Sequence, residues 1–196
     1  DRGPDSHKVK DGTPTMGGLL IIGSVIFSSI LWGDFSNRFL AVSLLCLFLF
    51  ALLGFADDFK KVKEKNSKGI SSWTKISFQL LFSLIISAVL YFYVFESNEL
   101  NYIVPFFKGV SISIGILFIP VSIFIIVGSS NAVNLTDGLD GLAILPVILI
   151  TSALGLIAWS AGNTIVSDYL YIPYIQGTGE LLAVSYTHLR AHETPR

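Results

Sequence analysis

Five apolar stretches, each about 17 to 20 residues long, constrain this chain more than any other feature. A helix needs about 20 mainly apolar residues to cross a bilayer, so each stretch predicts a membrane-spanning helix. The chain is 52% hydrophobic and 14% charged, whereas an average soluble domain is roughly 25% charged. The sequence therefore predicts an all-α, polytopic transmembrane helix bundle. Its expected spans are 16–32, 38–56, 76–95, 111–130 and 142–160.

Basic residues are distributed unevenly among the loops between these spans. Three precede the first span and six lysines follow the second, and the positive-inside rule makes that side cytoplasmic. Two further crossings return the polar loop at 131–141 to the same side, so the expected active-site loops are cytoplasmic. The connections at 33–37, 96–110 and 161–178 then face outward. The net charge of −1 offers no basic field, and we expect no nucleic-acid partner.

The two ends of the chain differ from the rest. It begins on a polar run without Met, which indicates a cut through a loop. Residues 179–184 predict the start of a sixth span, but the polar residues that follow cannot continue it. We therefore expect a partial transmembrane domain over 1–184 and a non-native tail over 185–196.

Four polar side chains recur at three-residue spacing after the fourth span: Asn131, Asn134, Asp137 and Asp140. This spacing stacks side chains on one face of a helical turn, so the four groups should converge. A carboxylate in the centre of a membrane helix costs roughly 2.5–3.5 kcal/mol, which makes acids near a bilayer functional candidates. The alternative is a helix N-terminus whose dipole stabilises an acid, but that leaves the two amides unexplained.

A second polar group, Asp57 and Asp58, follows the second span directly. Adjacent helical residues point about 100° apart, so we expect one carboxylate to face a metal and the other a substrate. Magnesium binds one or two protein carboxylates together with phosphate oxygens, which suits this sparse set of acids. Lys61 and Lys65 follow Asp57 at four-residue intervals and add a cationic stripe. The alternative for the lysines is an ordinary basic loop beside the membrane.

The loop before the first span is a candidate binding segment for phosphate or ribose. Gly12 and Pro14 favour a turn, and the hydroxyls of Thr13 and Thr15 lie near the cation Lys10. Close packing of a glycine-rich helix start explains the glycines equally well.

Three motifs together resemble the phospho-N-acetylmuramoyl-pentapeptide transferases, the MraY family, of the polyprenyl-phosphate N-acetylhexosamine-1-phosphate transferase superfamily. The motifs are DRGPDSHKVKDGTPTMGG, GFADDFKK and NAVNLTDGLDGLA, in this order and separated by apolar spans. The resemblance implies a Mg²⁺-dependent, multi-pass enzyme of the bacterial inner membrane. Such an enzyme transfers phospho-MurNAc-pentapeptide from UDP-MurNAc-pentapeptide to undecaprenyl phosphate and makes lipid I and UMP. A homodimer is a further candidate.

The resemblance also implies roles for single residues. Asp57, Asp58 and Asp137 match the catalytic acids, and Asp58 is the candidate metal ligand. The implied substrate-binding residues are Lys10, Thr15, Lys61, Lys65, Asn131, Asn134 and Asp140.

Several features of the family have no counterpart in this sequence. The first two helices, a later Phe-Met-Gly-Asp motif whose acid binds the metal, and a histidine-rich loop are absent from these 196 residues. We therefore expect an internal fragment that is inactive by itself.

Phosphoryl transfer requires neutralised charge and an in-line nucleophile. A phosphate monoester has its second pKa near 6, so the lipid phosphate is mostly a dianion at neutral pH and a strong base is not essential. This favours direct attack, with Asp57 positioning or deprotonating the lipid phosphate. A covalent aspartyl-phosphate route stays open.

Two other functions remain alternatives. A sister enzyme would transfer GlcNAc-1-phosphate from UDP-GlcNAc to a polyprenyl phosphate. A transporter or lipid-binding protein would place charged groups near the middle of its spans, whereas here they cluster at the span ends.

Overall fold

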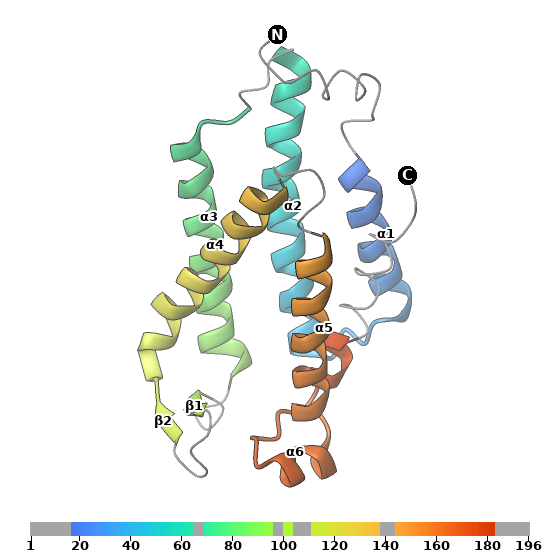
Figure 1. Ribbon diagram of the computed structural model, residues 1–196, viewed down its shortest axis with the longest axis vertical. Helices are drawn as coiled ribbons and strands as arrows, with labels where there is room; N and C mark the ends of the chain where they lie inside the picture. The colour runs from blue at the N-terminus through green and yellow to red at the C-terminus, as the bar shows by residue number, and fades with distance from the viewer. Residues whose placement is uncertain (1–16, 65–68, 96–99, 104–110, 138–143, 183–196) are drawn as a thin grey trace.

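The computed structural model describes residues 17–64, 69–95, 100–103, 111–137 and 144–182. Within these ranges the chain forms six α-helices and one antiparallel pair of short strands. Five of the helices are long and run along the molecule (Figure 1). The predicted all-α bundle is therefore confirmed.

The first three helices coincide with the first three predicted spans. They are α1 (Gly17–Trp32), α2 (Arg38–Glu64) and α3 (Ser72–Val89), and a π-helical turn, Leu90–Val94, extends α3. Helix α2 continues past the predicted end at residue 56, because the charged segment up to Glu64 contains good helix formers. Helix α3 begins four residues earlier than predicted. There the Ser71 side chain caps it by accepting a hydrogen bond from the Thr74 N–H at 3.3 Å.

The predicted span 111–130 is wrong at both ends. Strands β1 (Asn101–Ile103) and β2 (Ser111–Ser113) form a hairpin, and a 3₁₀ turn leads into α4 (Phe118–Asp137). The alternating Ser-Ile-Ser pattern has the two-residue period of a strand, which hydropathy alone conceals. At its other end α4 includes the first three members of the polar series, up to Asp137.

The last described segment, residues 144–182, contains two helices and a turn. Helix α5 (Ile144–Ala161) matches the fifth predicted span, and α6 (Thr164–Leu170) was not predicted. The Asn163 side chain caps α6 by accepting hydrogen bonds from the N–H groups of Ile165 and Val166. A 3₁₀ turn, Thr178–Glu180, occupies the expected start of the sixth span. The expected non-native tail, 185–196, lies outside the described residues.

The chain is a multi-pass membrane protein. Within the described ranges, α2, the extended α3 and α4 with its preceding turn are long and apolar enough to cross a bilayer. Helices α5 and α6 would make a fourth span if the pair, bent by 102°, is counted as one, and α1 is shorter. Large side chains such as Phe92 and Phe124 are exposed, which suits a hydrocarbon environment.

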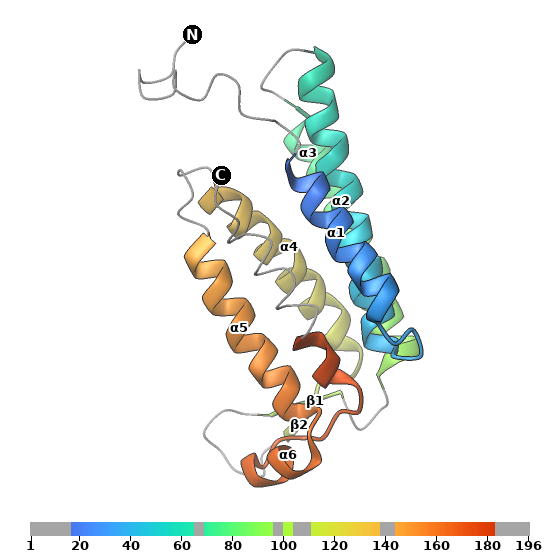
Figure 2. The ribbon, with the colours of Figure 1, turned by 90° about the vertical axis from the view of Figure 1, so that its right-hand side faces the viewer.

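Helix α3 packs against both α2 and α4, and α1 packs against α2. Phe39, Val42, Ile86 and Val94 form a buried cluster, and Cys46 packs against it. Figure 2 shows α1 to α3 on one side and α4 and α5 on the other. The C-terminal ends of α2 and α4 lie toward one end of the molecule, and α6 and the hairpin lie toward the other (Figures 1 and 2). The helices alternate in direction, so the acid pair of α2 and the polar series of α4 lie toward the same end of the molecule, as predicted.

Candidate active site

The acid pair lies inside α2, seven and six residues before its end. The apolar stretch stops at Ala56, but the helix continues to Glu64, so the two carboxylates leave it in different directions. The Asp57 side chain is 13% exposed, and the Asp58 side chain is 44% exposed. The two acids therefore occupy different surroundings.

Lys61 connects the two acids. Its Nζ lies 2.6 Å from Asp57 Oδ2 and 3.1 Å from Asp58 Oδ1. The four- and three-residue spacings place all three side chains on one helical face. Lys61 is thus part of a bonded triad, which the interpretation as a loosely solvated basic loop does not explain.

Asp57 also binds the connection between α2 and α3. The Ile70 N–H donates a hydrogen bond of 2.7 Å to Asp57 Oδ1. The preceding residue, Gly69, has φ +57°, in the left-handed region that glycine adopts without strain. A Cβ on Gly69 would collide with the Asp57 carboxylate and the Lys61 side chain. This role of Gly69 was not predictable from the sequence, because a lone glycine before a helix does not identify its neighbour.

These charged groups lie beyond the apolar stretch of α2. Burial would raise the pKa of the Asp57 carboxyl, but the hydrogen bonds from Lys61 and Ile70 and the charges of Lys61 and Lys75 lower it below its ordinary value. The hydrogen bond to Asp57 raises the pKa of the Lys61 ammonium, against the effect of burial and with help from Asp58. Asp57 and Lys61 are therefore both ionised at neutral pH.

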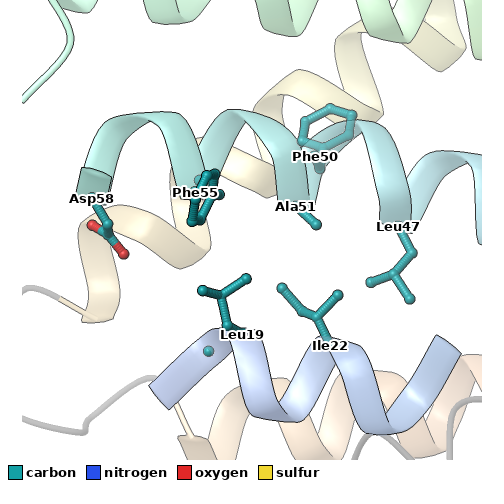
Figure 3. A pocket seen from close by; sticks show the side chains of 9 residues that line it. Leu19, Ile22, Leu47, Phe50, Ala51, Phe55 and Asp58 are labelled. Atoms are coloured by element: carbon teal, nitrogen blue, oxygen red, sulfur yellow. The ribbon is translucent and has the colours of Figure 1, made fainter. Parts of the chain in front are cut away.

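Asp58 lines one end of an apolar cavity of about 290 Å³ between α1 and α2. Figure 3 shows Leu19 and Ile22 of α1 opposite Leu47 and Ala51 of α2, with Asp58 beyond them. An accessible carboxylate thus adjoins apolar surface. The complete lining is Gly18, Leu19, Ile22, Leu47, Phe50, Ala51, Gly54, Phe55 and Asp58.

The polar series begins in the last two turns of α4. The Asn131 Nδ2 donates to Gln79 Oε1 at 3.0 Å and to the Val127 carbonyl at 2.8 Å. Asn134 is exposed. Asp137 is the last residue of α4, and its side chain is outside the described part of the structure. Asn131 therefore contacts the neighbouring helix, while Asn134 faces outward.

The helix N-terminus that the dipole alternative requires would lie among residues 138–143, before α5, and these are outside the described residues.

Four candidate residues cannot be placed relative to the triad. Lys10, Thr15, Lys65 and Asp140 lie outside the described residues. The structure brings together Asp57, Asp58 and Lys61 from the predicted set.

The described acids suit a sparsely coordinated cation. No group of three His, Cys, Asp or Glu side chains that could hold a metal occurs in the part of the chain that the structure describes. Mg²⁺ commonly takes only one or two protein carboxylates and completes its coordination with phosphates and water. Asp58 fits such a role, because it is the more exposed acid of the pair.

Residues 40–180 match the sequence model of glycosyl transferase family 4. The chain belongs to glycosyl transferase family 4. The matched segment contains the Asp57-Asp58 pair and the polar series from Asn131 to Asp140. Residues 10–22 match phospho-N-acetylmuramoyl-pentapeptide-transferase signature 1, which covers Lys10 and Thr15. The family 4 match and the signature confirm the predicted MraY-type membership.

Family 4 membership gives the coarse activity. The chain is of the polyprenyl-phosphate phosphosugar transferase type, and it is a membrane-bound phosphoglycosyl transferase. The family 4 match therefore favours a transferase over the transporter and lipid-binding alternatives.

Proposed function

We propose that this transferase moves phospho-MurNAc-pentapeptide from UDP to undecaprenyl phosphate, giving lipid I and UMP for peptidoglycan synthesis. The match of residues 10–22 to the pentapeptide-transferase signature is the observation that carries this choice of substrate. It favours the pentapeptide transferase over the sister enzyme that uses UDP-GlcNAc. The lysine-rich segment that begins in the last turns of α2 supports a cytoplasmic position of the active-site loops in the bacterial inner membrane.

The proposed reaction is a direct displacement at phosphorus. An oxygen of the lipid phosphate attacks the sugar-linked phosphorus, the bond from that phosphorus to the bridging oxygen breaks, and UMP leaves with the bonding electrons. The nucleophile is already a dianion near neutral pH. Asp57 is a weak base, because its two oxygens accept bonds from Lys61 and Ile70. We therefore propose that Asp57 positions Lys61. A covalent route through Asp57 would first have to break these hydrogen bonds.

The other two members of the triad would neutralise the charge of the transferring phosphoryl group. Lys61 supplies a fixed positive charge for the transferring phosphoryl group. Asp58 would hold Mg²⁺, which when bound neutralises phosphate charge and polarises the phosphoryl oxygens. Asp137 completes the proposed set of catalytic acids from α4.

We propose that the remaining candidates bind the nucleotide sugar. Asp140 would accept the uracil imide N–H, and the exposed Asn134 would bind ribose or phosphate. Asn131, Lys10, Thr15 and Lys65 complete this set.

The proposal is tested by UMP release from a completed enzyme, in which this chain is joined to the family segments that its sequence lacks. With undecaprenyl phosphate and Mg²⁺, we expect turnover of UDP-MurNAc-pentapeptide and at least tenfold less with UDP-GlcNAc, a difference of about 1.4 kcal/mol. Preference for UDP-GlcNAc would refute the substrate assignment. The 196-residue chain alone should release no UMP above a control without protein.

The proposed orientation is tested separately by cysteine labelling in a Cys46→Ser background. Cysteines at Ser67 and Asn134 should react with a membrane-impermeant thiol reagent only after the inner face is opened. A cysteine at Asn98 should react in intact cells. Labelling of Ser67 and Asn98 from the same side would contradict the proposed topology.

A further inference from the structure

A buried glutamine connects α3 to the polar end of α4. Gln79 is 1% exposed, and both ends of its amide group are bonded to α4. Its Nε2 lies 3.2 Å from Ser130 Oγ, and its Oε1 accepts a hydrogen bond of 3.0 Å from Asn131 Nδ2. Gln79 lies outside the three sequence motifs that carry the family resemblance.

The bonding pattern fixes α4 relative to α3. A buried amide in an apolar surrounding is costly unless it is hydrogen-bonded, so Gln79 favours the arrangement that keeps both bonds. Asn131 is held in turn, because its amide also donates to the Val127 carbonyl one turn earlier. Rotation or sliding of α4 would break the bond between the two amides.

Helix α3 is thereby connected to both halves of the proposed site. Asp57 binds Ile70 just before α3 begins, and Gln79 lies about two turns into that helix. Asn134 follows Asn131 by about one turn of α4. A change in the rotation of α4 would therefore move Asn134 relative to the acid pair.

We propose that Gln79 is a positioning residue that sets the rotation of the last two turns of α4 against α3. In doing so it places Asn134 for the nucleotide sugar. The effect on nucleotide-sugar binding rests on the proposed function, but the effect of Gln79 on the rotation of α4 does not.

Hydrogen–deuterium exchange on the 196-residue chain in detergent tests the positioning without any activity. Gln79→Met removes both bonds and keeps the side-chain length. We expect exchange of the 131–137 amides to increase at least about fivefold, near the value of one net hydrogen bond, with 38–56 unchanged. The matched control is Ser83→Ala, since Ser83 is fully buried one turn further along and its hydroxyl has no partner among the described residues. This control should leave exchange at 131–137 unchanged.

Kinetics of the completed enzyme separate positioning from general stability. Gln79→Met should raise the KM for the UDP-sugar about tenfold, with kcat within about twofold and the KM for the lipid unchanged. The control Ser83→Ala should leave kcat and both KM values unchanged.

Three results would overturn the inference: unchanged exchange at 131–137, equally increased exchange at 38–56, or a lower kcat with both KM values unchanged. A wild-type completed enzyme that releases no UMP would instead refute the proposed function, and the exchange result would stand.

Discussion

The polar ends of α2 and α4 obtain their contacts in different ways. On α2, Lys61 binds Asp57 and Asp58 within about one helical turn. On α4, Asn131 binds Gln79, which is 52 residues away in the sequence. The geometry of the α2 triad is therefore mostly local, whereas the orientation of the α4 series depends on packing against α3. This suggests that substitutions on α2 alter the chemistry and that substitutions around α4 alter binding.

The largest expected effect is that of Asp57→Asn in the completed enzyme. Loss of the carboxylate charge releases Lys61 and weakens the bond from Ile70. We expect kcat to fall at least about 100-fold, because these groups act mainly in the transition state. Steady-state UMP release measures the effect, and a kcat within about threefold of wild type would contradict the role of the triad.

A smaller loss is expected for Lys61→Met, which leaves Asp57 and Asp58 without their shared cation. We expect kcat to fall about 10- to 100-fold. The matched control is Lys63→Met, because Lys63 is an exposed lysine on the same charged segment. Equal losses in the two variants would show that net positive charge, not the triad, supports turnover.

Gly69→Ala tests the connection between the triad and α3. Its positive φ and the proximity of Asp57 leave no room for a methyl group, so we expect a destabilisation of about 1–3 kcal/mol. Thermal unfolding in detergent measures it. Gly54→Ala is the control, since a Cβ there would meet no atom and α2 is helical at that position. Equal melting temperatures for Gly69→Ala and wild type would contradict the close contact between Gly69 and Asp57.

The smallest expected effect is on stability in acid. The pKa of Asp57 is lowered in the folded state, so its ion pair stabilises the fold above the unfolded pKa of about 4. This contribution is lost as the pH falls through the lower folded value. Because Lys61 is partly exposed, we expect less than about 1 kcal/mol. Melting temperatures between about pH 5 and 2 should fall less for Asp57→Asn than for wild type, and parallel curves would contradict this.

Much of the helix bundle was predictable because helices that contact lipid are apolar, and apolar stretches are visible in the sequence. Each of the five long helices overlaps an apolar stretch of the sequence. The extension of α2 was missed because charged residues beyond Ala56 still favour a helix, and the start of α4 was wrong because Ser111–Ser113 pairs with a distant strand. Hydropathy does not report either effect.

The site was predictable where its contacts are local. The four-residue spacing of Asp57 and Lys61 predicted a shared helical face, and in the structure these two side chains form an ion pair. The bonds from Ile70 to Asp57 and from Asn131 to Gln79 were not predictable, since they depend on the path of a loop and on the packing of two helices.

Calorimetric binding of the UDP-sugar to Asp57→Asn and Asp140→Ala, both in the completed enzyme, tests the central distinction between chemistry on α2 and binding after α4. We predict that Asp57→Asn binds within about twofold of wild type. Asp140→Ala should lose about 1–3 kcal/mol, the value of a hydrogen bond to a charged acceptor. Wild-type affinity in Asp140→Ala together with lost binding in Asp57→Asn would reverse the assignment.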